Sequence, residues 1–446
     1  MLQNKILGVF SLTFIAIAAI FSLRSLPIAA VYGWGVIGLY GIAALVFFIP
    51  SAYVCNQLTL QVPRTGGLYA WVREAFGDRI GFLGIWFEWI NTVISFPTML
   101  TFALFTALFP FIPHLSEHHN VELILLLALF WGMTFINYLG IRVSSWFSNV
   151  CVIAGTLIPA VGIIVLGIYW VMSGHHIQIN FTASALIPQL HMNTLAFLIT
   201  LISSLSGIQA VAFHSQNAKH LGRDYPKASL LSVCIIMVLL IVGALAIASV
   251  TPMHQLNAVG GLITALQTFL NQFGLAWLLP VFGLLIALGV LAEVNVWLIS
   301  PSRGMFAAAQ AGQLPAIFSR QNRRGAPTAI LLTQAIVFTV LSLVYLLLPT
   351  INSAYWLLST IFGQLTLLMW LLVFASAIKL CSHIAAWKRW LIAGTGLVVC
   401  AGVFLSGFVP TSLIIEHKNV VQYEILLIIG IVVFAVLPIA WVHRKK

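Results

Sequence analysis

The chain has 446 residues, of which 61% are hydrophobic and only 7% are charged. An ordinary soluble domain carries roughly a quarter of its residues as Asp, Glu, Lys or Arg, so this composition excludes a water-soluble globular protein. A mean hydropathy of +1.08 indicates that lipid covers much of the surface. We therefore predict a polytopic membrane protein.

Two long stretches, residues 143–218 and 228–292, contain no Lys, Arg, Asp or Glu. A spanning helix needs about 20 apolar residues, so each stretch crosses the membrane several times. Polar and apolar residues do not alternate over segments of roughly ten residues, which argues against a transmembrane β-barrel. Backbone groups in lipid must then be paired within helices, and the predicted fold class is all-α.

Polar residues, prolines and glycines divide the apolar runs into twelve predicted transmembrane helices. Residues 1–23 are assigned to the first helix and not to a signal peptide, because Lys5 is a weak positive flank and no small-residue cleavage site follows. In chain order the helices are 6–31, 36–59, 81–109, 121–139, 146–172, 193–216, 227–249, 275–301, 327–348, 353–378, 389–408 and 421–442.

The first and sixth predicted helices are interrupted by polar residues and helix breakers: Ser22, Arg24, Ser25 and Pro27 in the first, and Ser203, Ser204, Ser206 and Gly207 in the sixth. From one break to the next there are five helices, an odd number, so a second unit of five would enter the membrane from the opposite side. Short amphipathic pieces at 63–79 and 252–274 occupy corresponding places on opposite faces. These features predict a five-plus-five inverted repeat whose broken helices meet near the midplane.

The predicted transport core covers residues 1–380, with repeats at about 1–172 and 193–380, and residues 381–446 add two further helices. With the N-terminus inside, 18 of the 20 Lys and Arg residues fall in inner segments. We therefore expect a multi-pass protein of a bacterial cytoplasmic membrane with both termini cytoplasmic. The basic residues are scattered over several segments and form no nucleic-acid patch.

The two breaks are the predicted site for a zwitterionic amino acid. Freed N–H groups at a half-helix N-terminus suit a carboxylate, and unwound carbonyls suit an ammonium group. The alternative is that Pro27 is an ordinary kink and that the serines are small packing residues. Within the bilayer, Arg24 would face a substrate, a wet cavity or a carboxylate. If the first helix ended at Leu23, Arg24 would instead lie at the outer interface.

Glu88 and Glu293 are isolated carboxyl groups deep within predicted helices, which makes both candidates for proton coupling. Each could instead be a structural acid paired to another helix. Gly289 and Trp297 lie one turn to either side of Glu293 and would share its face. Weaker candidates for substrate binding follow: Gln209, Phe213, Asn91 and Tyr355.

Eight of the twelve histidines fall in predicted outer segments, where solvated loop residues are the simpler interpretation than a pH sensor. Histidine and cysteine spacing indicates no metal site, and no cofactor is expected. The chain has no G-x-S-x-G, P-loop or G-x-G-x-x-G motif, and no nucleophile and base face each other in the predicted helices, so an enzyme is not expected.

Three segments resemble the amino acid-polyamine-organocation (APC) superfamily. Residues 63–72 with Phe76-Gly77 resemble the loop after its second helix, and residues 301–305 with 314–315 and 325–327 resemble the loop after its eighth helix. The third segment, Gly222-Arg223-Asp224-Tyr225-Pro226 with Gly289-Val290-Leu291-Ala292-Glu293, is similar to the bacterial glutamate/GABA antiporter branch. The resemblance implies a LeuT-like fold and amino-acid exchange by alternating access without ATP. It carries Glu293, Trp297 and Pro27 over to matching positions.

Several positions depart from that branch. Arg24-Ser25-Leu26-Pro27 stands where it has Tyr-Glu-Tyr-Pro, and Gln209 stands where it has glutamate, so glutamate does not follow as the substrate. Asn149 stands where a proton-coupled relative would have a lysine. The function we predict is an amino-acid antiporter with a small-molecule amino acid or amine as substrate. Proton-coupled symport and a transporter-like nutrient receptor stay open as alternatives.

Overall fold

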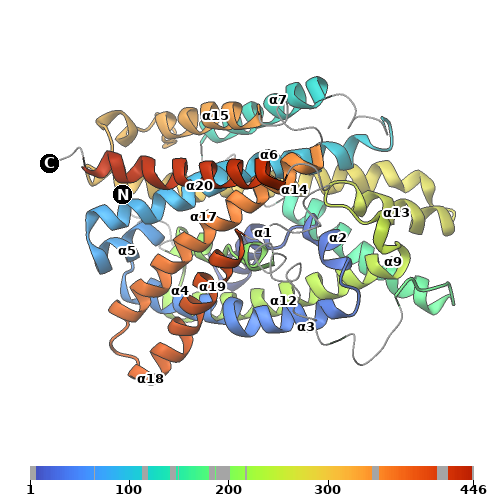
Figure 1. The fold of residues 1–446 in the computed structure, drawn as a ribbon, viewed down its shortest axis with the longest axis horizontal. Helices are drawn as coiled ribbons and strands as arrows, with labels where there is room; N and C mark the ends of the chain where they lie inside the picture. Colours follow the sequence, from blue (N-terminus) through green and yellow to red (C-terminus); the bar gives the residue numbers. More distant parts are fainter. Residues whose placement is uncertain are drawn as a thin grey trace.

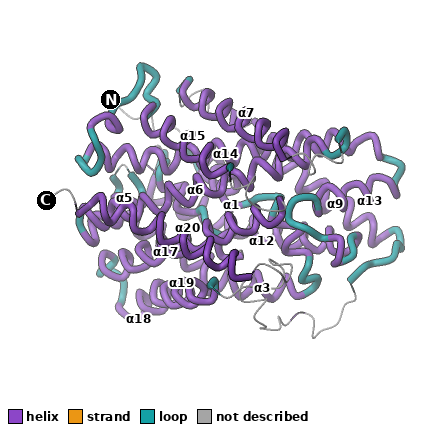
Figure 2. The backbone as a smooth tube through the Cα atoms, turned by 45° about the horizontal axis from the view of Figure 1, so that its top comes forward, coloured by secondary structure: helices purple, strands orange, loops and turns teal. Residues whose placement is uncertain are grey.

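The computed structural model describes residues 7–64, 66–112, 119–140, 147, 148, 150–179, 186, 201–215, 218–343, 351–408 and 420–443. Within these ranges the chain is almost wholly helical (Figures 1 and 2). The first half contains α1 (Val9–Ile20), α2 (Ser25–Ala30), α3 (Gly35–Ala43), the π-helix η1 (Ala44–Phe48), α4 (Ile49–Gln61), α5 (Leu68–Phe76), α6 (Asp78–Leu108), α7 (His119–Tyr138), the π-helix η3 (Ile153–Leu157) and α9 (Ile158–Met172).

The second half contains α11 (Ile208–Ala212), α12 (Leu221–Val250), α13 (Gly261–Gln272), α14 (Leu279–Gln310), α15 (Thr328–Ser342), α17 (Ile351–Leu380), α18 (Ala386–Arg389), the π-helix η9 (Trp390–Gly394), α19 (Thr395–Ser406) and α20 (Val420–His443). Short 3₁₀ turns lie at Met253–Gln255, Ala276–Leu278 and Ala316–Ser319.

Eight helical segments in the described ranges are long and apolar enough to cross a membrane: Gly35–Gln61, Asp78–Leu108, Asn120–Tyr138, Val150–Met172, Leu221–Val250, Ala276–Gln310, Ala354–Leu380 and Ala386–Ser406. Shorter apolar helices lie at Val9–Ile20, Leu201–Ala212, Thr328–Ser342 and Glu424–Pro438. A polytopic, all-helical membrane fold is therefore the architecture of the described chain.

Helix α6 occupies the centre of the bundle, where 89% of its most apolar window is buried. It packs against α14 and α17, which come from the second half of the chain. The outward faces of α9, α15 and α20 are apolar, with exposed fractions of 57% at Val165, 60% at Val340 and 52% at Leu437. Polar groups turned inward and aliphatic groups turned outward are the pattern of a protein solvated by lipid.

The two short amphipathic helices lie at opposite ends of the bundle. In both views α5 is at the left end and α13 is at the right end, while α6 runs lengthwise between these ends (Figures 1 and 2). Helix α5 follows the second predicted span and α13 precedes the eighth. Their placement matches the opposite faces that the sequence assigns to them.

Helices α14 and η3 approach until their backbones touch. A Cβ atom added at Gly289 would lie 2.3 Å from the carbonyl oxygen of Gly155, so glycine is required at this crossing. The sequence predicted that Gly289 would share the face of Glu293. In the structure the missing side chain of Gly289 serves the crossing with η3.

Two segments that carry the resemblance are helical here, including residues 301–305, which resemble a superfamily loop. Residues 301–305 continue α14, and residues 222–226 form the first turns of α12. Pro226 and Pro301 both lie inside their helices, where proline removes one backbone donor, and the long α12 and α14 accommodate them. Elsewhere the described helices lie within a few residues of the predicted ones, and residues 193–200 of the predicted sixth helix lie outside the described residues.

A short backbone strap joins the start of the chain to the segment before α12. Leu7 forms a parallel bridge with Ala218, and the amide of Lys219 donates to the Leu7 carbonyl at 2.9 Å. The beginning of α1 is thereby attached to the beginning of α12, against which α1 also packs.

Candidate functional site

The helical backbone stops between α1 and α2. Helix α1 ends at Ile20, and Phe21 adopts an extended conformation with φ −79° and ψ 111°. Helix α2 begins at Ser25, two residues before Pro27. Residues 21–24 therefore carry main-chain groups that are not all committed to helical hydrogen bonds.

A second interruption precedes α11. Residues 201–204 are helical, residues 205–207 are not, and Gly207 has φ +136°. A Cβ atom at Gly207 would lie 2.8 Å from the carbonyl oxygen of Ala19 and 2.8 Å from Ile20 Cγ1. The two interruptions thus lie against each other, and both the backbone angle and the close approach call for glycine.

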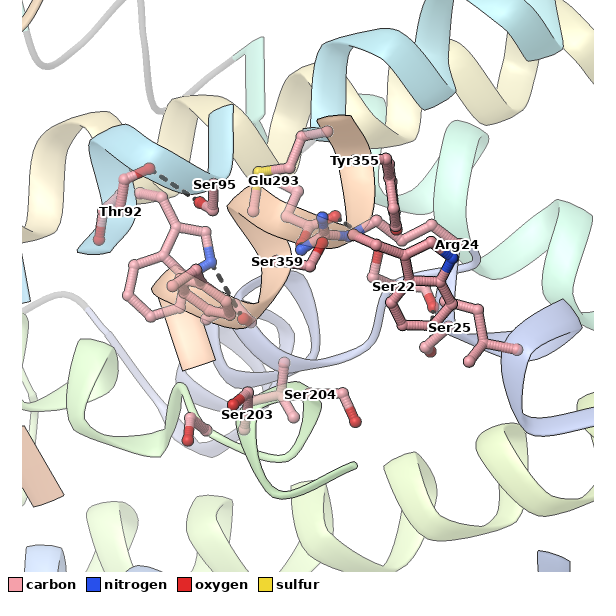
Figure 3. A pocket seen from close by; sticks show the side chains of 18 residues that line it. Ser22, Arg24, Ser25, Thr92, Ser95, Ser203, Ser204, Glu293, Tyr355 and Ser359 are labelled. Atoms are coloured by element: carbon pink, nitrogen blue, oxygen red, sulfur yellow. Dashed lines mark hydrogen bonds and ion pairs between the residues drawn. The ribbon is translucent and has the colours of Figure 1, made fainter. Parts of the chain in front are cut away.

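A pocket lies beside these interruptions, and its empty volume, counted with its open mouth, is about 710 Å³. Side chains from α2, α6, α14 and α17 surround it (Figure 3). The lining consists of Ala19, Ile20, Ser22, Arg24, Ser25, Ile28, Thr92, Ser95, Met99, Ser203, Ser204, Ser206, Glu293, Trp297, Tyr355, Trp356, Ser359 and Phe362.

Arg24 and Glu293 are the charged pair of this pocket. Arg24 Nη2 lies 3.8 Å from Glu293 Oε1, and the two side chains are 15% and 8% exposed. The Ser22 hydroxyl donates to Glu293 Oε2 at 2.8 Å, while Arg24 Nη1 donates to Thr98 Oγ1 at 2.9 Å. Each charged side chain thus forms a hydrogen bond with a hydroxyl group in addition to its 3.8 Å ion-pair contact. These contacts lower the free-energy cost of burying the two charges.

Aromatic side chains tie the pocket wall to the interrupted segments. The indole N–H of Trp297 donates to the Ala19 carbonyl at 3.1 Å, at the last turn of α1. The indole N–H of Trp370 donates to Ser206 Oγ at 3.0 Å, in the second interruption. Both interruptions are therefore held in place by donors from α14 and α17.

Glu88 lies outside the pocket lining and is connected to the second interruption through Gln209. The Gln209 amide donates to Glu88 Oε1 at 3.1 Å, and Gln209 Oε1 accepts from the Gly207 N–H at 2.9 Å. Glu88 is 1% exposed, and its other carboxyl oxygen has no hydrogen-bond partner within the described part of the chain.

Nine of the residues predicted for the site line this one pocket: Ser22, Arg24, Ser25, Ser203, Ser204, Ser206, Glu293, Trp297 and Tyr355. Five lie elsewhere. Pro27 packs toward Gly261, Gly207 and Gln209 lie behind the wall, and Asn91 donates to Thr366 Oγ1 at 3.1 Å. The ring of Phe213 fills the space beside Gly67 and Gly304, between α5 and α14.

Sequence reasoning missed a stripe of α6 that lines the pocket: Thr92, Ser95 and Met99. These residues follow Glu88 at intervals of four, three and four residues, which is the spacing of one helix face. The same reasoning missed Ser359, which lies one turn after Tyr355. The signal was present as hydroxyl residues at helical spacing in strongly apolar segments.

Among the described residues there is no group of three His, Cys, Asp or Glu side chains placed to hold a metal ion. The pocket offers hydroxyls, one guanidinium, one carboxylate, main-chain groups and aromatic walls. This set suits a small polar molecule that carries charges of both signs.

Comparison with known proteins agrees with this architecture. Residues 7–435 match a family model described as amino acid permease. An uncharacterized transporter of Legionella pneumophila is 41% identical, with all of this chain and 97% of the relative covered. A glutamate/gamma-aminobutyrate antiporter of Lactococcus lactis is 29% identical over 91% of this chain and 84% of that protein.

A putative arginine/ornithine antiporter of Escherichia coli is 25% identical, over 98% of this chain and 99% of its own length. Among solved structures, MhsT in complex with L-phenylalanine superposes with a TM-score of 0.58 at 13% identity, covering 91% of this chain and all of MhsT. That likeness shows a shared fold. The sequence match over nearly the whole length shows that the chain belongs to the amino acid permease family of the APC superfamily and is an amino-acid transporter.

Proposed function

We propose that the protein is an amino-acid antiporter that works by alternating access. The observation that carries the proposal is the close approach of Gly207, in the interruption at residues 205–207, to Ala19 and Ile20 at the end of α1, just before the interruption at residues 21–24 and beside a pocket whose empty volume, counted with its open mouth, is about 710 Å³. Main-chain donors and acceptors there suit the carboxylate and ammonium groups of an amino acid. Two relatives whose names include antiport support exchange as the mode.

The proposed architecture is a LeuT-like inverted repeat of twelve transmembrane helices. Residues 1–380 form the core, with repeats at about 1–172 and 193–380, and residues 381–446 add two helices. The placement of α5 and α13 at opposite ends of the bundle supports this arrangement (Figure 1). The basic inner segments support cytoplasmic termini in a bacterial inner membrane.

The charges in the pocket favour a substrate whose side chain is uncharged. Arg24 and Glu293 compensate each other at 3.8 Å, so a zwitterion enters without adding net charge. A substrate with one further charge would leave that charge unpaired in a largely buried site, which costs several kcal/mol by the usual desolvation penalty, about that of one buried ion. The serine-rich lining fits a small polar or apolar side chain.

Exchange is tested with the purified protein in liposomes. Radiolabelled amino acids chosen from a thermal-shift screen are added outside, with and without unlabelled substrate inside. We expect uptake to be stimulated at least tenfold, on the order of 1.4 kcal/mol in barrier height, by internal substrate. Uptake that is indifferent to internal substrate contradicts antiport.

Proton-coupled symport is the second candidate, and the carboxyl group of Glu88 favours it. This group is buried, is linked through Gln209 to the Gly207 amide, and has one oxygen without a partner among the described residues. Substrate-dependent acidification of the lumen of empty liposomes would support symport. Its absence, together with stimulation by internal substrate, would leave exchange.

A further inference from the structure

A second pocket lies away from the proposed amino-acid site, between α7, α14 and α15. Its empty volume, counted with its open mouth, is about 480 Å³. The polar side chains in its lining are Asn137, Ser302, Arg303 and Gln321, and residues 325–327 complete the wall. Arg303 lies ten residues after Glu293 on α14, about 15 Å along the helix, so the two pockets are distinct.

Arg303 brings a half-buried positive charge to this pocket without a carboxylate partner. Seven of the nine Asp and Glu residues lie in the described ranges, and none of these forms an ion pair with Arg303. Its Nη1 atom lies 3.5 Å from His214 Nδ1. A guanidinium only donates hydrogen bonds, so His214 Nδ1 is the acceptor in this contact. An acceptor nitrogen carries no negative charge, and the positive charge of Arg303 therefore stays uncompensated.

The wall of the pocket is held in one shape by Asn322. Its side-chain oxygen accepts from the backbone amides of Arg324 and Ala326, both at 2.9 Å, and its amide donates to the Tyr138 carbonyl at 2.9 Å. The segment that carries Gln321 is therefore folded on itself and pinned to the end of α7. Such a wall exists before a ligand arrives.

Three further arginines, Arg320, Arg323 and Arg324, are exposed on the same segment. Exposed arginines in an inner loop are what membrane topology alone predicts. Membrane topology does not explain the half-buried Arg303. Nor does it explain Gln334, which lies behind Ser302 and whose buried amide nitrogen has no hydrogen-bond partner in the described ranges. A guanidinium in a preformed pocket, with three exposed arginines next to its wall residues in the sequence, matches the geometry and charge of a phosphate group.

We propose that this pocket binds a phosphate-bearing anion through Arg303. The phosphate belongs to an anionic lipid headgroup at the inner membrane surface or to free phosphate from the cytoplasm; both would meet the same guanidinium. The site goes beyond the proposed exchange of amino acids and does not depend on it.

Binding is measured with the full chain in detergent. Three probes are titrated separately: short-chain phosphatidylglycerol, phosphatidylcholine of equal chain length, and inorganic phosphate. We expect phosphatidylglycerol or inorganic phosphate to bind, and Arg303→Gln to weaken that binding at least about tenfold, the usual scale for a charge-assisted hydrogen bond. Saturation by phosphatidylglycerol alone identifies a lipid, whereas saturation by inorganic phosphate identifies a free anion.

Arg223→Gln is the matched control, because it removes an exposed arginine at the start of α12, away from the pocket. It should bind like the unaltered protein. If Arg303→Gln does not fold, Gln321→Trp narrows the exposed rim and should weaken binding without removing a charge. Equal binding by Arg303→Gln, equal preference for phosphatidylcholine, or no binding of either phosphate probe overturns the proposal.

Discussion

At the scale of single residues, Glu293 is the carboxylate of the proposed amino-acid pocket. Its two oxygens face Ser22 and Arg24. We expect Glu293→Gln to abolish the pH dependence of exchange or to change it strongly, because the amide cannot take up a proton in this range. Exchange rates measured between pH 5 and 8 check this prediction. Unperturbed histidine also titrates in this range, at about pH 6.5.

Glu74→Gln is the control for that experiment, because it removes an exposed carboxylate of α5 that pairs with Arg64 at the surface. It should leave the pH profile unchanged. A Glu293→Gln variant that keeps both the profile and the turnover of the unaltered protein would remove the role assigned to this residue.

Trp297 is the aromatic wall of the same pocket and is 9% exposed. We expect Trp297→Ala to weaken substrate binding at least about tenfold, since loss of a buried aromatic contact costs on the order of 1.5 to 3 kcal/mol. Thermal shift or equilibrium binding with the best amino acid measures the effect. Trp387→Ala, at an exposed surface position, should bind normally, and undiminished affinity of Trp297→Ala would count against the assignment.

At the scale of elements, the second interruption depends on Gly207. With φ +136° and the Ala19 carbonyl only 2.8 Å from an added Cβ atom, alanine would strain the backbone and push the two interruptions apart. The strain is on the order of 1 to 3 kcal/mol, so exchange should fall at least about tenfold in Gly207→Ala. Gly402→Ala on α19, where an added Cβ atom meets nothing within 4 Å, should exchange normally.

The sequence predicted most helices because apolar runs of spanning length and their polar punctuation are local properties. Pro27 and Gly207 carry backbone constraints with them, and residues 21–24 and 205–207 lie outside regular helix, while their role as paired breaks of a membrane-spanning repeat stays a prediction. The sequence did not predict that Gly289 would serve a helix crossing or that Thr92 and Ser95 would line the pocket. The spacing of Thr92 and Ser95 marks one helix face, but the neighbour that this face meets, like the partner of Gly289, is set by packing between distant segments and not by the local pattern.

At the scale of the whole molecule, the proposed orientation places the 3₁₀ turn at Met253 outside and the loop at Gln321 inside. Both residues are exposed. In intact cells, a membrane-impermeant thiol reagent should label Met253→Cys but not Gln321→Cys, and permeabilised cells should show labelling of both. Unaltered protein gives the background from the five native cysteines. The reverse pattern would invert the topology.

The strap between Leu7 and Lys219 has a consequence at this scale as well. Any tilt of α1 away from α12 must either break the 2.9 Å amide bond of Lys219 or drag the start of α12 along. The proton on that single amide therefore reports whether α1 and α12 separate at this end of the bundle. Hydrogen–deuterium exchange of this amide should be slow while the ends of α1 and α12 stay attached, and it should become faster during turnover.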